Sequence, residues 1–272
     1  MSHVALGNPD NYTIGGLRFY FSEDISGSTP VAIVAADNTP GSSTVSLAGD
    51  LTATYGVGSR FTITGDSDNN GTYDVASSSF DATNTVVVLV QDLSGTTGDG
   101  DVTLTRGSEL YLGNVVTGSY TSDLSFLDHF TAKAGTRSKD RSIVQEISVS
   151  INLTLDEPNV DNMNLFMLGG TVTDVAGSPA SKRFAPYTKT ERSGGARLAG
   201  VSDTGNEWVW TVLTCSVKPD GDFSFDDQDW SQFNFIVDVL SDSTNPTTPF
   251  GFVDHYGVGE NIDVTLPLGD NS

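Results

Sequence analysis

The sequence predicts an all-β fold with one short α-helix and a small β domain inserted near the N-terminus. Two observations support this fold class. Glycine, serine, threonine and aspartate are abundant, and they separate short runs that alternate with the period of half-buried strands. Long amphipathic helical windows are absent outside residues 158–168, so a helical bundle or an alternating β/α fold is not expected.

Residues 14–22 predict the first strand, with Leu17, Phe19 and Phe21 on its apolar side. Directly after this strand the composition changes, and a separate unit begins. The late block 231–240 has the same alternation as the first strand, and it predicts the last strong strand.

Residues 26–106 predict an inserted small β-barrel or β-sandwich. Trp, Met, Glu and Lys are absent from this stretch, and its strand patterns are closely spaced. We expect the apolar valine run to be its central strand. The expected strands are residues 31–35, 44–47, 60–64, 72–77 and 86–90. The turn-rich residues 94–101 separate the insert from the segment that follows.

One segment of the insert matches the first nine positions of a calcium-binding loop, with Gly71 at the sixth position. Its twelfth position is Ser77 rather than a bidentate Glu, and no helices flank it. The alternative is a hairpin turn at Asn70-Gly71, which we favour. No other metal or cofactor is predicted. The candidate calcium ligands are Asp66, Asp68, Asn70 and Asp74.

After the insert, strand patterns resume at residues 109–114 and 115–122. The next segment, SDLSFLDHFTAKAGTRSKDR, shows no clean periodicity and carries several bases. We expect an ordered surface loop or a long hairpin there, and a loop of this length in a compact domain is usually functional or disordered.

A long strand and a short helix then follow. From Ile143 to Leu155 the apolar residues alternate with polar ones, which predicts one buried and one solvent-exposed face. Such a strand is about twice the usual length and suits the wall of a tube better than a compact sandwich. Asp156 is the expected N-cap of a helix over 158–168, and Gly169-Gly170 are expected to end it.

The residues after the helix predict further strands. Trp208, Trp210 and Val212 alternate in one phase, and Leu213 and Cys215 continue in the other. This change of phase predicts a β-bulge or a strand that switches its buried face. The tail after residue 242 is rich in turn residues, and we expect it to lie across the surface.

The net charge is −22, with 13 Lys and Arg against 35 Asp and Glu. Such a surface disfavours tight binding to nucleic acid, because phosphate contacts need bases. Most bases lie within residues 133–218, and none follows Lys218. This basic middle and the acidic end either attract each other between subunits or neutralise each other within one fold.

Catalytic patterns are not found. The histidines are His3, His129 and His255, and no nucleophile elbow, HExxH, phosphate-binding glycine loop or paired-cysteine zinc pattern occurs. The pair Asp226-Asp227 is typical of solvated loop acids, and Cys215 of a small buried residue. We therefore do not expect an enzyme. No secretory signal or membrane-spanning run is recognised, so export by that route and membrane insertion are not expected.

Four segments together resemble a known family. They are GGLRFYFSED, ELYLGNVVTGSYTSDLSFLDHFTAKAGTRSKD, SVSINLTLDEPNVDNMNLFMLGG and KPDGDFSFDDQDWSQFNFIVDVLSD. Their order and spacing resemble the major tail tube proteins of long-tailed, siphovirus-type bacteriophages. The resemblance covers residues 1–25 and about 107–245, and its most specific part is the long strand with the helix and the Gly-Gly pair.

This resemblance implies a β-sandwich or barrel of the tail-tube type with one flanking helix, formed by residues 1–25 and 107–272. It further implies hexameric rings that stack into a tube with a negatively charged channel, through which DNA passes without specific binding. Tape-measure, tail terminator and distal tail proteins are the implied partners. The implied location is the virion tail, and the host cytoplasm during assembly. The inserted residues 26–106 are then expected on the tube exterior.

In this family the loop that matches residues 128–141 reaches towards a neighbouring ring. The resemblance therefore implies inter-ring or inter-subunit contacts for His129, Lys133, Arg137, Lys139 and Arg141. The alternative function is a tail-associated or surface carbohydrate-binding β protein, with residues 26–106 as the binding module. A hydrolase would need convergent acids, and nothing in the order of residues points to them.

Overall fold

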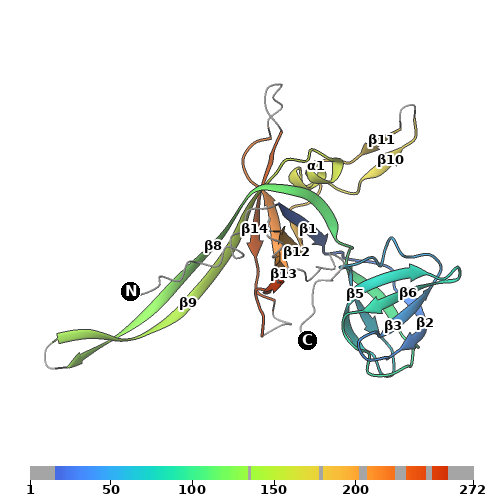
Figure 1. The fold of residues 1–272 in the computed structure, drawn as a ribbon, viewed down its shortest axis with the longest axis horizontal. Helices are drawn as coiled ribbons and strands as arrows, with labels where there is room; N and C mark the ends of the chain where they lie inside the picture. Colours follow the sequence, from blue (N-terminus) through green and yellow to red (C-terminus); the bar gives the residue numbers. More distant parts are fainter. Residues whose placement is uncertain are drawn as a thin grey trace, which may run out of the picture.

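A computed structural model describes residues 16–133, 136–177, 180–201, 207–223, 231–242 and 247–256. Within these residues the chain forms a seven-stranded sheet, a separate closed barrel of six strands, a two-stranded sheet and one short α-helix. The predicted all-β class with one helix is confirmed. Figure 1 shows the barrel at one end of the long axis and the tip of a long hairpin at the other, with the rest of the sheet between them.

The seven-stranded sheet has the order β12-β1-β8-β9-β14-β13-β15, and all its pairings are antiparallel. Strands β12 and β13 also pair with each other, so the sheet curves back on itself around one core. Its strands are β1 (Leu17–Glu23), β8 (Leu110–Lys133), β9 (Thr136–Leu155), β12 (Arg192–Val201), β13 (Glu207–Pro219), β14 (Phe233–Val239) and β15 (Phe252–Tyr256).

Alternating side chains of these strands form the core of the sheet. Phe19 and Phe21 of β1 are buried, as the first-strand pattern predicts, and β14 buries every second residue. In β13 the register shifts against β12 between Val212 and Cys215, so one additional residue lies in β13 at this point. The predicted bulge is confirmed at this position. The tail contributes β15, an edge strand that the sequence pattern missed.

Helix α1 (Val160–Phe166) packs on this core through Leu165 and Phe166, and the Phe166 ring contacts Phe233 and Phe235. The helix is shorter than the predicted 158–168. Its N-cap is Asn159, whose side chain accepts a hydrogen bond from the Asn162 backbone N–H. The expectation that Asp156 caps the helix is therefore wrong, because the chain continues non-helically for three more residues.

The end of the helix also differs from the prediction. Leu168, rather than a glycine, has the left-handed conformation after the C-cap, with φ of 46°. Gly169 is required for a different reason: a Cβ there would lie 2.6 Å from the Phe184 ring. The chain then forms a small hairpin of β10 (Thr173–Val175) and β11 (Ser181–Arg183).

The barrel has the strand order β2-β3-β6-β5-β4-β7, and its last strand closes against its first. Its strands are β2 (Val31–Asp37), β3 (Thr44–Ala48), β4 (Arg60–Thr64), β5 (Gly71–Phe80), β6 (Asn84–Leu89) and β7 (Asp101–Arg106). The valine run is β6, but only alternate residues of it face the apolar interior, because in a closed barrel every strand has one outer side. Strand β7 was not predicted.

The polypeptide passes between the sheet and the barrel twice, from β1 to β2 and from β7 to β8, and these two adjacent chain crossings join the barrel to the sheet. Asp24 and Arg106 form a β-bridge and an ion pair of 2.8 Å, and the Ser22 hydroxyl donates to the Gly107 carbonyl. The Glu109 N–H donates to the carbonyl of Val57, which lies in the connection between β3 and β4 of the barrel. These contacts fix the barrel on the sheet at its root.

Candidate functional site

The most unusual feature is the hairpin of β8 and β9, which we call the ribbon where it leaves the sheet, at residues 116–133 and 136–148. Strand β8 pairs with β1 only at Leu110–Val115, and β9 pairs with β14 only at Val149–Leu155. Beyond these points the two strands pair with each other and, within the described residues, with no third strand. At about 3.3 Å per residue, the ribbon extends roughly 40 Å. Figure 1 shows it projecting away from the rest of the molecule.

One face of the ribbon is mostly apolar and exposed, and near the tip Asp128 and Lys139 interrupt it. The register places Leu124 beside Ile147 and Phe126 beside Val144, on the same face as Tyr120. This face continues the surface that, at the base of the hairpin, buries Ile151 in the core. We call it the apolar face, and its members are 41–58% exposed: Tyr120, Leu124, Phe126, Phe130, Val144 and Ile147.

The opposite face carries small polar and acidic side chains over most of its length. Its members are Ser119, Thr121, Asp123, Ser125, Glu146 and Ser148, and Ser150 and Asn152 continue it along β9 within the sheet. Leu127 and Ile143, a cross-strand pair near the tip, interrupt this polar face. The two faces of the ribbon thus differ in polarity. The apolar face exposes a patch of large apolar side chains, which in soluble proteins usually marks an interaction site.

The register corrects one sequence expectation. Ile143 was expected on the buried face of a strand that begins there, but β9 begins at Thr136. A register shift places one additional residue, Gln145, between the partners of Ser125 and Phe126. Val144 therefore takes the apolar face and Ile143 the polar one. Ile143 and Ile147 are also exposed rather than buried.

The five predicted contact residues all lie at the distal end of the ribbon. Lys139 pairs with Asp128 at 2.6 Å, and His129 Nδ1 lies 2.6 Å from a carboxylate oxygen of Asp140. His129 and Arg141 are register partners. The structure thus brings these residues together at one end of the ribbon. Of Lys133, only its backbone position opposite Thr136 is described.

Arg137 has a different partner at the tip. Its guanidinium lies 4.6 Å from the centroid of the Phe130 ring, which forms a cation–π contact at the end of the apolar face. The Lys139 ammonium and the Ser142 hydroxyl both contact Asp128, and they hold the pKa of that carboxyl below its ordinary value. The tip is therefore organised by local polar contacts on an otherwise unsupported hairpin.

Bases of the 182–218 segment pair within the chain. Arg197 and Glu109 form a deeply buried ion pair of 2.6 Å, and Arg192 and Lys189 both contact Glu23. Burial raises the pKa of Glu109, and Arg197 opposes this shift. These partners precede the acidic C-terminal stretch in sequence. Lys218 does contact an acid of that stretch, Asp238.

The calcium candidates do not converge. Asp66 Oδ1 accepts the N–H groups of Asp68 and Asn69, whereas Asp74 faces away and pairs with Arg60 at 2.7 Å. Asp66 Oδ2 is buried without a partner. Within the described residues, no group of three or more His, Cys, Asp or Glu side chains could hold a metal ion. Strands β4 and β5 form a hairpin across this segment, as the alternative predicted, but its turn is not at Asn70-Gly71: Gly71 already belongs to β5 and pairs with Ile63, and residues 65–70 form the connection.

Other candidates for chemistry are inert or lie elsewhere. Cys215 is fully buried, and burial raises the pKa of its thiol to about 12. The His255 ring packs against Trp208 with ring centroids 4.3 Å apart. His3 and the pair Asp226-Asp227 lie outside the described residues. The described part of the chain has no helix long and apolar enough to cross a membrane.

Comparison with known proteins does not assign the chain to a family. No family model matches the sequence, and no curated protein matches it.

Proposed function

We propose that this protein is the structural subunit of a phage tail tube, which polymerises into stacked hexameric rings around a channel for DNA. The observation that carries the proposal is the bare apolar face of the ribbon. An isolated two-stranded hairpin is marginally stable in water, and its unpaired edges invite pairing with another chain. Copies of the same chain supply both the missing strands and the missing cover.

The size of the apolar face indicates what kind of assembly is needed. Burying the exposed half of each large side chain gives about 1 kcal/mol, so the whole face gives roughly 6 kcal/mol. The cost of association is about 4–15 kcal/mol. One such contact is therefore marginal, and a ring in which every subunit makes two contacts is favoured over a dimer.

The polar face supports the same proposal. If the apolar face packs against protein, the face with Asp123, Glu146 and small hydroxyl side chains is left towards solvent. In a closed ring this face lines the channel. Like-charge repulsion at such a wall decays over about 8 Å at physiological salt, so it keeps DNA from adhering without blocking its passage.

The barrel is then an exterior decoration. It lies at the opposite end of the molecule from the ribbon tip (Figure 1), so a wall formed by the ribbons and the sheet leaves the barrels free to project outwards. Tape-measure, tail terminator and distal tail proteins are the partners that such a tube requires, and the virion tail is its location.

Electron microscopy of the purified protein tests the proposal. We expect rings with a central hole, or striated tubes, that increase with protein concentration. Deleting residues 26–106 should leave these assemblies intact, whereas a carbohydrate-binding function of the barrel predicts loss of glycan binding alone. A protein that remains monomeric, also in tail-bearing particles, would refute the tail tube function.

A further inference from the structure

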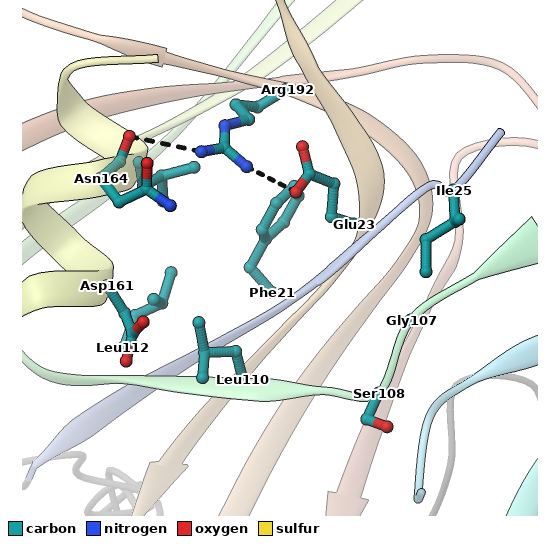
Figure 2. Close-up of a pocket in the computed structure, with 11 residues that line it drawn as sticks. Phe21, Glu23, Ile25, Gly107, Ser108, Leu110, Leu112, Asp161, Asn164 and Arg192 are labelled. Carbon is teal, nitrogen blue, oxygen red and sulfur yellow. Dashed lines mark hydrogen bonds and ion pairs between the residues drawn. The ribbon is translucent and has the colours of Figure 1, made fainter. Parts of the chain in front are cut away.

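A pocket of about 330 Å³ lies between helix α1, strand β1 and the two chain crossings that lead to the barrel. This volume is at the small end of the range of about 300–1,000 Å³ that is typical of ligand pockets. Figure 2 shows Asp161 and Asn164 of α1 on one side and Ile25, Gly107 and Ser108 on the other. The apolar lining consists of Phe21, Ile25, Leu110, Leu112 and Leu165.

Some of the charged side chains around this pocket have ion-pair partners and one does not. Arg192 is buried at one side, where it pairs with Glu23 at 2.5 Å and donates to the Asn164 carbonyl at 3.3 Å (Figure 2). It also donates to the Gly169 carbonyl at 2.6 Å. Lys189 also contacts Glu23, so two bases share this one carboxylate. Asp161 is only partly buried and, within the described residues, has no hydrogen-bond or ion-pair partner. The pocket therefore offers an apolar interior with one unpaired carboxylate at its rim.

The ribbon tip has the complementary chemistry. Phe130 is 41% exposed, and Arg137 lies against its ring. Lys139 is already neutralised by Asp128, whereas Arg137 has no acidic partner among the described residues. The tip thus presents an aromatic ring together with an unpaired guanidinium, in a protein whose net charge is −22.

We propose that the ribbon tip of one copy docks into this pocket of a second copy. Phe130 contacts the apolar interior, and Arg137 pairs with Asp161 at the rim. The pocket lies on the barrel side of the sheet and the tip at the other end of the molecule (Figure 1), so the contact does not form within one chain. Repeated between copies, such a head-to-tail contact builds a ring or a filament. This inference rests on the proposed function and names the receptor for the predicted contact residues.

Charge reversal tests the pairing. We expect Arg137→Glu and Asp161→Arg each to raise the concentration needed for assembly roughly tenfold. The double variant should recover most of the loss, because the pair is restored with opposite polarity. Matched controls are Arg183→Glu and Asp174→Arg, two exposed positions on the β10–β11 hairpin. They should assemble like the parent. Thermal unfolding is measured for each variant and for the milder Asp161→Asn. It shows whether a variant has lost the contact between copies or the stability of the helix.

Single variants that assemble like the parent, or a double variant no better than the singles, would overturn the docking. A cross-linking experiment gives an answer independent of tubes. One chain with Arg137→Cys is mixed with another with Asp161→Cys and oxidised, and we expect a mixed disulfide dimer because the native Cys215 is buried. No mixed dimer overturns the docking. A parent protein that never assembles, but gives this dimer, refutes the tube and not the contact.

Discussion

The barrel and the ribbon differ in how they treat the unpaired edges of their strands. In the barrel every strand has two neighbours, since β2 pairs with β7 and closes the circuit. Its interior side chains, such as Val45, Phe61 and Val87, are fully buried. In the ribbon neither strand has an outer neighbour among the described residues, and side chains of equal size such as Phe126 are more than half exposed.

This difference indicates which part of the chain is complete by itself. Closure removes the unpaired backbone groups that make an edge strand prone to pair with another chain. The barrel needs no partner for its own stability. The ribbon keeps its edges and its apolar face, and on the proposed function it is the part that other copies complete.

The largest expected effect separates the two regions directly. A fragment of residues 25–107 should fold alone and unfold cooperatively, because it retains the whole barrel and its core. A fragment of residues 115–155 should be unfolded, because a lone hairpin cannot bury its apolar residues. Circular dichroism and thermal melting measure both. A folded ribbon fragment at monomeric concentration would contradict the comparison.

The next effect concerns the two faces of the ribbon. Leu124→Asn with Phe126→Asn should abolish assembly, because it removes apolar area that only another copy can bury. Thr121→Asn with Ser125→Asn introduces the same side chains on the polar face and should leave assembly intact. Since all four positions are exposed, the monomer's free energy of unfolding should change by about 0.5 kcal/mol or less per site. Sedimentation velocity distinguishes the outcomes, and equal behaviour of the two variants contradicts the assignment of faces.

The third effect tests the buried pair near the root of the barrel. Arg197→Met should lower the free energy of unfolding by about 3–5 kcal/mol, because it leaves the Glu109 carboxylate buried and unpaired. The pKa of Glu109, already raised by burial, then rises further. The destabilisation should therefore be larger at neutral pH than at about pH 3, well below the ordinary pKa of 4.5, where the carboxyl is protonated in the unfolded state as well as in the folded one.

Denaturant melts at both pH values measure this effect. Arg197→Met combined with Glu109→Leu serves as the control, and it should lose much less stability because no charge is left unpaired. A single variant whose loss is independent of pH would argue against this role for the pair.

The smallest effect concerns the ribbon tip. The pKa of Asp128 is held below its ordinary value of 3.8 by Lys139 and Ser142. The ionised Asp128 carboxylate therefore helps to order the ribbon tip above pH 3.8. This ordering should disappear as the pH falls through the lower pKa that Asp128 has in the folded state. NMR titration of the Asp128 carboxyl measures the midpoint. A midpoint at or above 3.8, or an unchanged tip in Asp128→Asn, would contradict this.

Part of this architecture follows from the sequence alone. The alternation of Phe233, Phe235, Val237 and Val239 predicts a strand, and the structure buries all four residues. The phase change near Val212 predicts the bulge in β13. These predictions succeed because one face of each strand packs on a core, so its pattern must match the period of the strand.

The ribbon could not be predicted in the same way. Its apolar face has the alternation of a buried strand, but within one chain nothing covers Leu124 or Ile147 among the described residues. Burial by a second copy leaves the same pattern as burial in a core. The irregular register near Gln145 also hides the continuation of β9 towards Thr136. Likewise, the spacing of acidic residues in the sequence predicts Asp74 as a candidate calcium ligand. Only the fold shows that Asp74 forms an ion pair with Arg60 instead.

The bridge between Asp24 and Arg106 has a consequence for the evolution and engineering of this chain. The polypeptide enters and leaves the barrel at neighbouring positions. The barrel can therefore be replaced by another domain without changing the distance between the two attachment points in the sheet. A different fold with adjacent termini, joined at the same two points, would be displayed in its place. Such a junction provides a grafting site for epitopes or enzymes.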